Sequence, residues 1–197
     1  KSKINRINEI LKKESADSLL IGTLDTIAWL YNMRGNDVKC NPVAVCFAYV
    51  SKKESVLFIN PKKVTPEAAA YLKSQNVVLA EYDKVFDYVA KLKETICIDS
   101  SKITLKLLNT IDKANSVIDI PSPADLMKAC KNETELEGFR NAMLKDGVAL
   151  VRFYMWLEAN VKSGKVKETD VAKKLIEFRS EQDMFVGESF DTIAGYG

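Results

Sequence analysis

The sequence has 197 residues, enough for one large domain or for one domain and part of another. Apolar residues make up 47% and charged residues 28%, which excludes a disordered chain, and the net charge of +2 gives no reason to expect nucleic acid or an anionic membrane as partner. There is no histidine, which excludes the side chain most often used as general base and as metal ligand.

The amino-terminal third predicts a helix, a strand and a second, brief helix before a long loop. Apolar residues recur at helical spacing over 3–13, and 18–23 is a short apolar run typical of a buried strand. Asp25 is expected to cap a brief helix that ends near Tyr31. The stretch 32–42 contains glycine, asparagine, aspartate and proline and is therefore predicted to be a loop.

The next stretch predicts a hairpin followed by alternating helices and strands. Two apolar runs, 43–50 and 55–60, are joined by four polar residues, as in a β-hairpin. Further strands are predicted at 77–81, 95–99 and 116–119, with helices at 66–75, 85–92 and 105–111. This alternation predicts an α/β layer structure with a mixed sheet over the first 120 residues or so.

The pattern changes after two prolines, Pro121 and Pro123. Asn132 predicts the start of a long helix over 133–161, and Thr169 opens a second helix. The residues 185–193 alternate as in a strand and run into a glycine turn, Gly195-Tyr196-Gly197, that normally leads to a second strand.

Few side chains suggest chemistry, and each has a structural alternative. No glycine-rich phosphate loop is present. Glu133, Glu135 and Glu137 could hold a metal, but at a helix start they are expected to complement its positive end. Arg34 lies in the glycine-containing loop, where a guanidinium can reach a ligand; alternatively, it pairs with Asp37 or Asp25 and fixes the loop.

The four cysteines form no paired motif. The cysteines are Cys40, Cys46, Cys97 and Cys130; Cys46 and Cys97 lie within apolar runs, and none is part of a C-x-x-C pair. Free thiols are the favoured interpretation, and they suit a reducing cytoplasm. No apolar run of membrane-spanning length and no signal-peptide pattern is present.

Three stretches together resemble one family. The segments 23–43, 131–158 and 177–197 resemble, in order and spacing, the middle domain, the first catalytic helix and the active-site entry of long, three-domain aminopeptidase P enzymes (Xaa-Pro aminopeptidases). The resemblance implies a creatinase N-terminal-like domain over 1–125. Residues 126–197 would then be a truncated N-terminal portion of a pita-bread metallopeptidase domain.

The resemblance also implies a function. The family removes an N-terminal residue that precedes proline, and it uses two divalent metal ions, usually manganese, whose ligands are Asp, His and Glu. The resemblance further implies a cytoplasmic homodimer. No catalytic residue and no metal ligand can be carried onto this sequence, so the chain itself is expected to be inactive; only Arg34 is expected to bind substrate. Ala44 and Val45 stand where the family often has bulky aromatics.

The sequence also leaves a second class of function open, and it disfavours a third. The chain could be a non-catalytic binding or assembly module that shares the fold. A nucleotide-binding α/β domain is disfavoured because the phosphate loop is absent.

Overall fold

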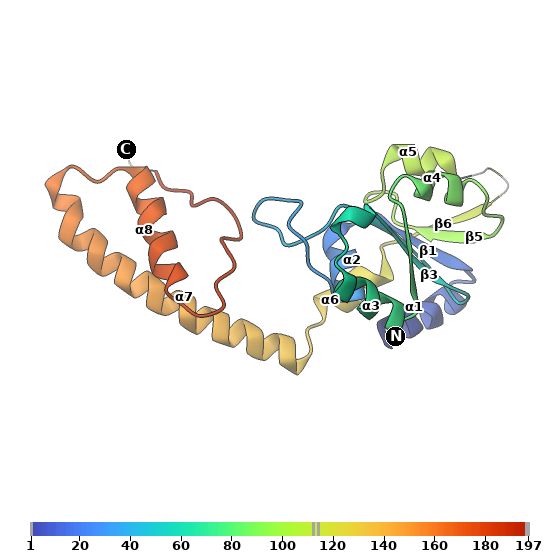
Figure 1. Cartoon of the computed structure of the whole chain (residues 1–197), viewed down its shortest axis with the longest axis horizontal. Helices are drawn as coiled ribbons and strands as arrows, with labels where there is room; N and C mark the ends of the chain where they lie inside the picture. Colours follow the sequence, from blue (N-terminus) through green and yellow to red (C-terminus); the bar gives the residue numbers. More distant parts are fainter. Residues whose placement is uncertain (1, 112, 114, 196–197) are drawn as a thin grey trace. The chain divides into compact units, whose positions relative to one another are not determined.

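The structure, a computed structural model, describes residues 2–111, 113 and 115–195 and divides into two compact units (Figure 1). The first unit contains the residues up to Val38 together with Pro42–Cys130, and the second contains Lys39–Asn41 and the residues from Lys131 onward. Tyr196 and Gly197 of the predicted glycine turn lie outside the described residues.

A six-stranded mixed sheet forms the centre of the first unit, which confirms the predicted fold class. The strands lie in the order β4-β3-β2-β1-β5-β6. Only β2 is antiparallel to its neighbours, and it forms the predicted hairpin with β3, in which Val50 pairs with Ser55. The strands are β1 (Ser18–Ile21), β2 (Cys46–Ser51), β3 (Ser55–Ile59), β4 (Val77–Ala80), β5 (Thr95–Ile98) and β6 (Ser116–Asp119).

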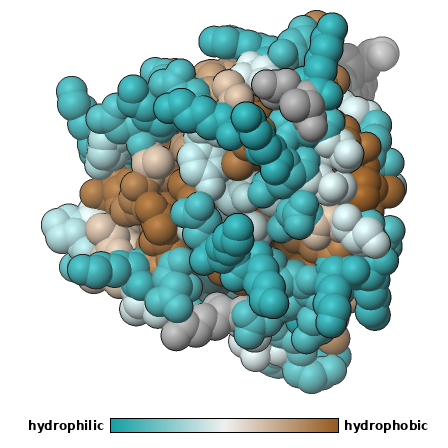
Figure 2. All heavy atoms as spheres, turned by 90° about the vertical axis from the view of Figure 1, so that its right-hand side faces the viewer, coloured by the Kyte–Doolittle hydropathy of each residue, from teal (hydrophilic) through white to brown (hydrophobic). Residues whose placement is uncertain are grey.

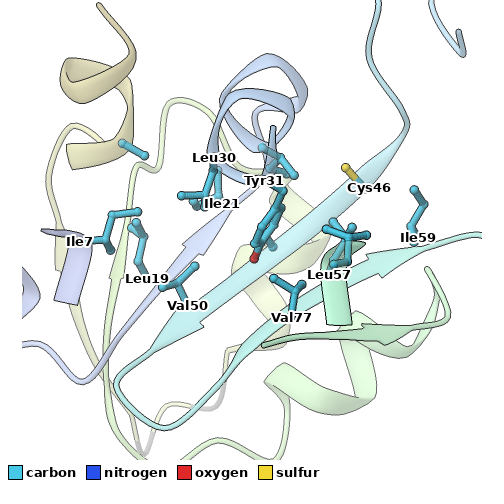
Figure 3. Close-up of a cluster of buried hydrophobic side chains, with 14 of the residues drawn as sticks. Ile7, Leu19, Ile21, Leu30, Tyr31, Cys46, Val50, Leu57, Ile59 and Val77 are labelled. Atoms are coloured by element: carbon cyan, nitrogen blue, oxygen red, sulfur yellow. The ribbon is translucent and has the colours of Figure 1, made fainter. Parts of the chain in front are cut away.

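Helices cover both faces of this sheet. Figure 3 shows the core on one face, where side chains of β1, β2 and β3 such as Leu19, Val50 and Leu57 meet Ile7 and Leu30. The helices on that face are α1 (Ser2–Lys13), α2 (Leu24–Tyr31), α3 (Pro66–Ser74) and α6 (Pro123–Ala129). The opposite core is covered by α4 (Lys84–Val89) and α5 (Leu105–Thr110).

The structure differs from the sequence-based expectations at two places in this unit. Helix α6 was not expected from the sequence; it begins at Pro123, and the first turn of a helix tolerates proline because an N–H there has no helical partner. Asp25 does not cap α2, because Thr23 occupies the N-cap position and Asp25 lies inside the first turn.

The second unit contains α7 (Glu133–Asn160), the short 3-10 helix η2 (Val161–Ser163) and α8 (Glu168–Ser180). The long helix begins with a capping box in which the side chain of Asn132 accepts from the Glu135 amide and Glu135 accepts from the Asn132 amide, both at 2.9 Å. Phe153 of α7 and Leu175 of α8 are buried.

The predicted strand over 185–193 is absent, so that prediction was wrong. The described residues after α8 form turns and irregular backbone, and Gly187 has a φ of 153°. A strand is stabilised by hydrogen bonds to a neighbour, and none of the six paired strands lies in this part of the chain.

One face of the molecule carries mostly polar side chains. Figure 2 shows hydrophilic side chains over much of the face it draws, with hydrophobic atoms gathered in separate patches. Within the described residues, no helix has both the length and the apolar character needed to cross a membrane.

Candidate functional site

The candidate site is built on the loop between α2 and β2, residues 32–45. The loop starts where α2 ends, at Asn32, whose backbone adopts the left-handed conformation with φ 52° and ψ 45°. The next amide, of Met33, donates to the carbonyl oxygen of Ala28 at 2.9 Å, which anchors the start of the loop to the last turn of α2.

The two ends of the loop are hydrogen-bonded to each other. The Gly35 amide donates to the Pro42 carbonyl oxygen, and the Asp37 amide donates to the Val43 carbonyl oxygen, both at 3.1 Å. The side chain of Asp37 adds a third link, because its Oδ2 accepts from the amide of Val45 at 2.7 Å. The backbone of the loop is therefore folded back onto the residues that lead into β2.

Arg34 projects from this folded loop. Its side chain is exposed, and its NH1 donates to the Met33 carbonyl oxygen at 2.8 Å. Across residues 2–111, 113 and 115–195, Arg34 forms no ion pair. Asp37 pairs with Lys63, with Nζ 2.7 Å from Oδ1, and Asp25 pairs with Lys128. The alternative interpretation of Arg34 as a clasp to either carboxylate therefore has no support in the structure.

The carboxyl groups of Asp37 and Asp25 have different surroundings, but both have a lowered pKa. The hydrogen bond from Lys63 holds the pKa of Asp37 below its usual range, and the Val45 amide acts in the same direction. Burial alone would raise the pKa of Asp25, but the hydrogen bond and charge of Lys128 lower it overall. Both groups are anions at neutral pH, and each is already partnered by a lysine.

A cavity of about 430 Å³ lies beside the loop. It opens where β3 and β4 end, which is the edge where ligands of open α/β sheets usually bind. Lys63 connects the cavity to the loop, since it lines the cavity and pairs with Asp37. Val45 also lines the cavity, whereas Ala44 is buried. The other lining residues are Asn60, Pro61, Lys62, Glu81, Tyr82 and Asp83.

The acidic residues at the start of α7 serve the helix. Glu135 belongs to the capping box, and Glu137 accepts from Arg140 at 3.4 Å, as expected for a helix start. In the part of the chain that the structure describes, no three His, Cys, Asp or Glu side chains are grouped closely enough to hold a metal ion.

The cysteines are free thiols, as predicted. Cys46 and Cys97 are buried within the sheet, and burial raises the pKa of Cys46 to about 12 and that of Cys97 to about 11. Cys40 is half-buried and Cys130 is exposed.

The sequence pattern alone does not reveal the contact between Asp37 and Lys63 in this site. In the sequence, Asp37 is notable only as a possible partner of Arg34. A loop aspartate three residues after an arginine carries no local signal for a partner 26 positions away.

Comparisons with known proteins place the fold in a family. Residues 1–135 match the family described as Creatinase/Prolidase N-terminal domain. A probable Xaa-Pro aminopeptidase P of Laccaria bicolor is 40% identical over 203 residues, which are 99% of this chain and 31% of that protein. A protein of the same name from Trichophyton verrucosum is 38% identical over 207 residues, covering 99% of this chain and 30% of the relative.

Solved structures show the same similarity in fold. An X-prolyl aminopeptidase from Caenorhabditis elegans, described as a cytosolic enzyme with a di-nuclear active site, matches 98% of this chain and 33% of its own with a TM-score of 0.90 and 31% identity. An Xaa-Pro dipeptidase from Bacillus anthracis matches 91% of this chain and 48% of its own with a TM-score of 0.62; at 14% identity it shows a likeness in fold alone.

The family match covers the whole six-stranded sheet and its helices, and the similarity to aminopeptidases P continues through α7 and α8. The chain spans 31% of the length of the Laccaria bicolor relative and 33% of the Caenorhabditis elegans one. Over residues 1–135 the chain belongs to the creatinase/prolidase N-terminal domain family, and over nearly all of its length it is similar to Xaa-Pro aminopeptidases P.

Proposed function

We propose that this chain is part of a metal-dependent aminopeptidase that removes the N-terminal residue preceding proline. The observation that carries the proposal is the extent of the similarity, 40% identity over 99% of the chain and a TM-score of 0.90 over 98% of it. A likeness confined to the sheet would support a fold alone, whereas this one includes both units.

In this proposal the two parts of the chain have different roles. Residues 1–125 form the creatinase-like middle domain, and 126–197 begin a pita-bread catalytic domain. The compact first unit extends to Cys130, because Ala124 and Met127 of α6 are buried in its core. The parent protein is proposed to be a cytoplasmic homodimer that binds peptides with proline in the second position.

The chain does not itself fit a di-nuclear metal centre. It has no histidine, and among the described residues no three His, Cys, Asp or Glu side chains are grouped as metal ligands. We therefore place the ligands of the two divalent ions, proposed to be manganese, in another part of the parent protein. The chain on its own is expected to be inactive, and bound metal would polarise the carbonyl and supply hydroxide only in the complete enzyme.

The residue of this chain proposed to bind the substrate is Arg34. Its guanidinium is exposed, carries no ion pair among the described residues and extends from a loop whose backbone is held on both sides. Such a group can bind a peptide carbonyl or carboxylate through a forked, charge-assisted contact.

The function is tested with the complete parent protein. It should hydrolyse peptides with proline in the second position, lose this activity with EDTA and regain it with Mn²⁺; matched peptides with alanine in the second position should be cleaved slowly or not at all. A complete protein that binds such peptides without hydrolysing them would instead support the non-catalytic module. The purified chain of residues 1–197 should show no turnover in the same assay.

The role of Arg34 is tested by Arg34→Lys in the complete protein, because lysine keeps the charge and loses the fork. We expect kcat/KM to fall about ten- to a hundredfold, the equivalent of about 1.5–3 kcal/mol, at unchanged melting temperature. Arg6→Lys, at an exposed position of α1 in the same unit, is the matched control and should change neither quantity. Normal kcat/KM with a lower melting temperature would make Arg34 structural.

A further inference from the structure

We propose that Asp37 is a positioning residue, which holds the loop backbone from which Arg34 reaches the peptide substrate. The inference rests on the proposed function, since it gives Asp37 a role through Arg34. In this role Asp37 binds neither the substrate nor a metal ion.

Each carboxylate oxygen of Asp37 already has a partner within the first unit. Oδ2 accepts from the Val45 amide and Oδ1 accepts from Lys63 Nζ, each at 2.7 Å. The side chain of Asp37 is only 13% exposed. One carboxylate thus links the loop to the residue before β2 and to the end of the short 3-10 helix η1 (Pro61–Lys63).

The backbone on either side of Arg34 is hydrogen-bonded to other parts of the unit, whereas the guanidinium contacts the neighbouring residue Met33. Met33 is anchored to α2 through Ala28, and Gly35 is anchored to Pro42. Asp37 holds the second half of the loop through its backbone and its side chain. Among the residues that the structure describes, the Arg34 guanidinium donates to the adjacent Met33 carbonyl oxygen at 2.8 Å and to no other element.

A fixed backbone beneath a projecting guanidinium matters for binding. A side chain that starts from an ordered backbone loses less conformational freedom when it binds, so more of the contact energy appears as affinity. Loosening the loop would therefore weaken the contact of Arg34 with substrate, although Arg34 itself is unchanged. The effect of removing Asp37 should depend on the presence of Arg34.

A merely structural carboxylate provides the control. Asp119 of β6 also accepts a backbone hydrogen bond, from the Ser100 amide at 2.9 Å, but β6 is the edge strand three positions from β2 in the sheet. Removing Asp119 should affect stability without affecting substrate binding. Asp37 and Asp119 thus form a matched pair for mutation.

The experiment is a double-mutant cycle in the complete protein, with kcat, KM and melting temperature measured for each variant. Asp37→Ala should lower kcat/KM about fivefold or more when Arg34 is present, and by less than about twofold in the Arg34→Ala background. Asp37→Asn retains one acceptor for the Val45 amide and should have a smaller effect than Asp37→Ala. Asp119→Ala should leave kcat/KM within about twofold of the parent.

A second measurement does not depend on activity. In the chain of residues 1–197, Asp37→Ala should speed hydrogen exchange at the Val45 amide and leave the Ser100 amide unchanged, whereas Asp119→Ala should do the reverse. Lys63→Met removes the ion pair and keeps the Val45 bond, so it should speed exchange at Val45 less than Asp37→Ala does.

The outcomes separate the two hypotheses. If Arg34→Ala leaves kcat/KM normal, the substrate role of Arg34 in the proposed function fails, and the positioning role fails with it. If Arg34→Ala lowers kcat/KM but Asp37→Ala and Asp37→Asn do not, only the positioning role is overturned. An equal loss from Asp37→Ala in both backgrounds would also overturn it, because Asp37 would then act independently of Arg34.

Discussion

Gly35 lies so close to Ala44 that a β-carbon added to Gly35 would be 2.8 Å from the Ala44 amide nitrogen and 2.9 Å from the Ala44 β-carbon. It would also lie 2.9 Å from the carbonyl carbon of Val43. Two of these three atoms belong to the backbone and cannot turn away as a flexible side chain can. Glycine at position 35 thus allows the loop to close against the segment that leads into β2.

We expect Gly35→Ala to destabilise the first unit by about 1–3 kcal/mol, the usual cost of forcing extra volume into a packed contact. Urea denaturation would measure this loss of stability, and hydrogen exchange at the β2 amides would show where it occurs. Gly147→Ala in α7 is the control, because nothing lies within 4 Å of the added carbon, and alanine there should stabilise the helix by about 0.5–1 kcal/mol. Rescue of Gly35→Ala by Ala44→Gly would contradict the backbone origin of the clash.

The contact between α7 and α8 gives a second prediction. Arg179 donates from Nε to Asp146 Oδ1 at 2.6 Å and from NH2 to Oδ2 at 3.3 Å. The two side chains are 27% and 34% exposed, so solvent weakens the pair only in part. Arg179→Lys loses the forked contact. We expect this substitution to lower the free energy of unfolding of the second unit by about 1 kcal/mol, as measured by thermal unfolding.

The matched control for this pair is Arg140→Lys. Arg140 contacts Glu137 at 3.4 Å on the surface of α7, and both side chains are at least 60% exposed. Arg140→Lys should therefore change the free energy of unfolding by less than about 0.5 kcal/mol. Equal effects of the two substitutions would show that the fork between Arg179 and Asp146 adds nothing beyond a surface charge pair.

Periodicity predicted most of the fold because it reports local burial. The alternation of apolar strands and helices over the first 120 residues or so led to the mixed sheet, and Asn132 marked the start of α7. The same signal failed at 185–193, where the residues alternate but no neighbouring strand is paired with them. Helix α6 was not predicted because proline usually indicates the end of a helix. Proline disrupts the interior of a helix but is tolerated at its first turn, where Pro123 lies.

The candidate site could be predicted only in part. The glycine and the arginine identified the loop, but the partners that hold it are distant in sequence. The link between Asp37 and Lys63 joins residues 26 positions apart, and the two are brought together by the hairpin of β2 and β3. Contacts of this kind depend on tertiary structure, which the local pattern of the loop does not encode.

The thiols should react at very different rates. Burial keeps Cys46 and Cys97 protonated, with pKa values of about 12 and 11, whereas Cys130 is exposed. At pH 8 we expect a disulfide reagent such as DTNB to modify Cys130 quickly, and Cys46 and Cys97 only when the first unit unfolds. Cys130→Ser should remove the fast phase, and fast modification of either buried thiol in the folded chain would contradict the prediction.

Acid should weaken the first unit through Asp37 and Asp119. Hydrogen bonds from Lys63 and from Ser100, respectively, lower the pKa of these carboxyl groups below the ordinary value of 3.8. A carboxyl group with a lowered folded pKa contributes stability that is fully present above its unfolded pKa and is lost as the pH falls through its folded pKa. The melting temperature should therefore fall below about pH 4, with a shallower fall in Asp37→Asn. An unchanged acid dependence in that variant would contradict the contribution of Asp37.

The last prediction concerns an apolar stripe on α7. Leu144, Val148, Val151 and Met155 are spaced as one face of a helix, and each is at least 51% exposed in the structure. A different face of the same helix contacts α8, where Phe153 is buried and Asp146 pairs with Arg179. The helix α7 thus has apolar residues both on the face that packs against α8 and on a face that is exposed to solvent.

An exposed apolar stripe of this kind should bind a hydrophobic dye. We expect the chain of residues 1–197 to enhance the fluorescence of ANS, and the double substitution Leu144→Gln and Val151→Gln to reduce the enhancement by half or more, because glutamine is polar and retains a helix propensity close to that of leucine. The matched control is Val186→Gln, an exposed position outside the helix, which should leave dye binding unchanged. Circular dichroism would verify that the helix content is preserved in each variant. A monomeric chain that binds no dye, or dye binding that the double substitution does not reduce, would show that the stripe is not accessible in solution.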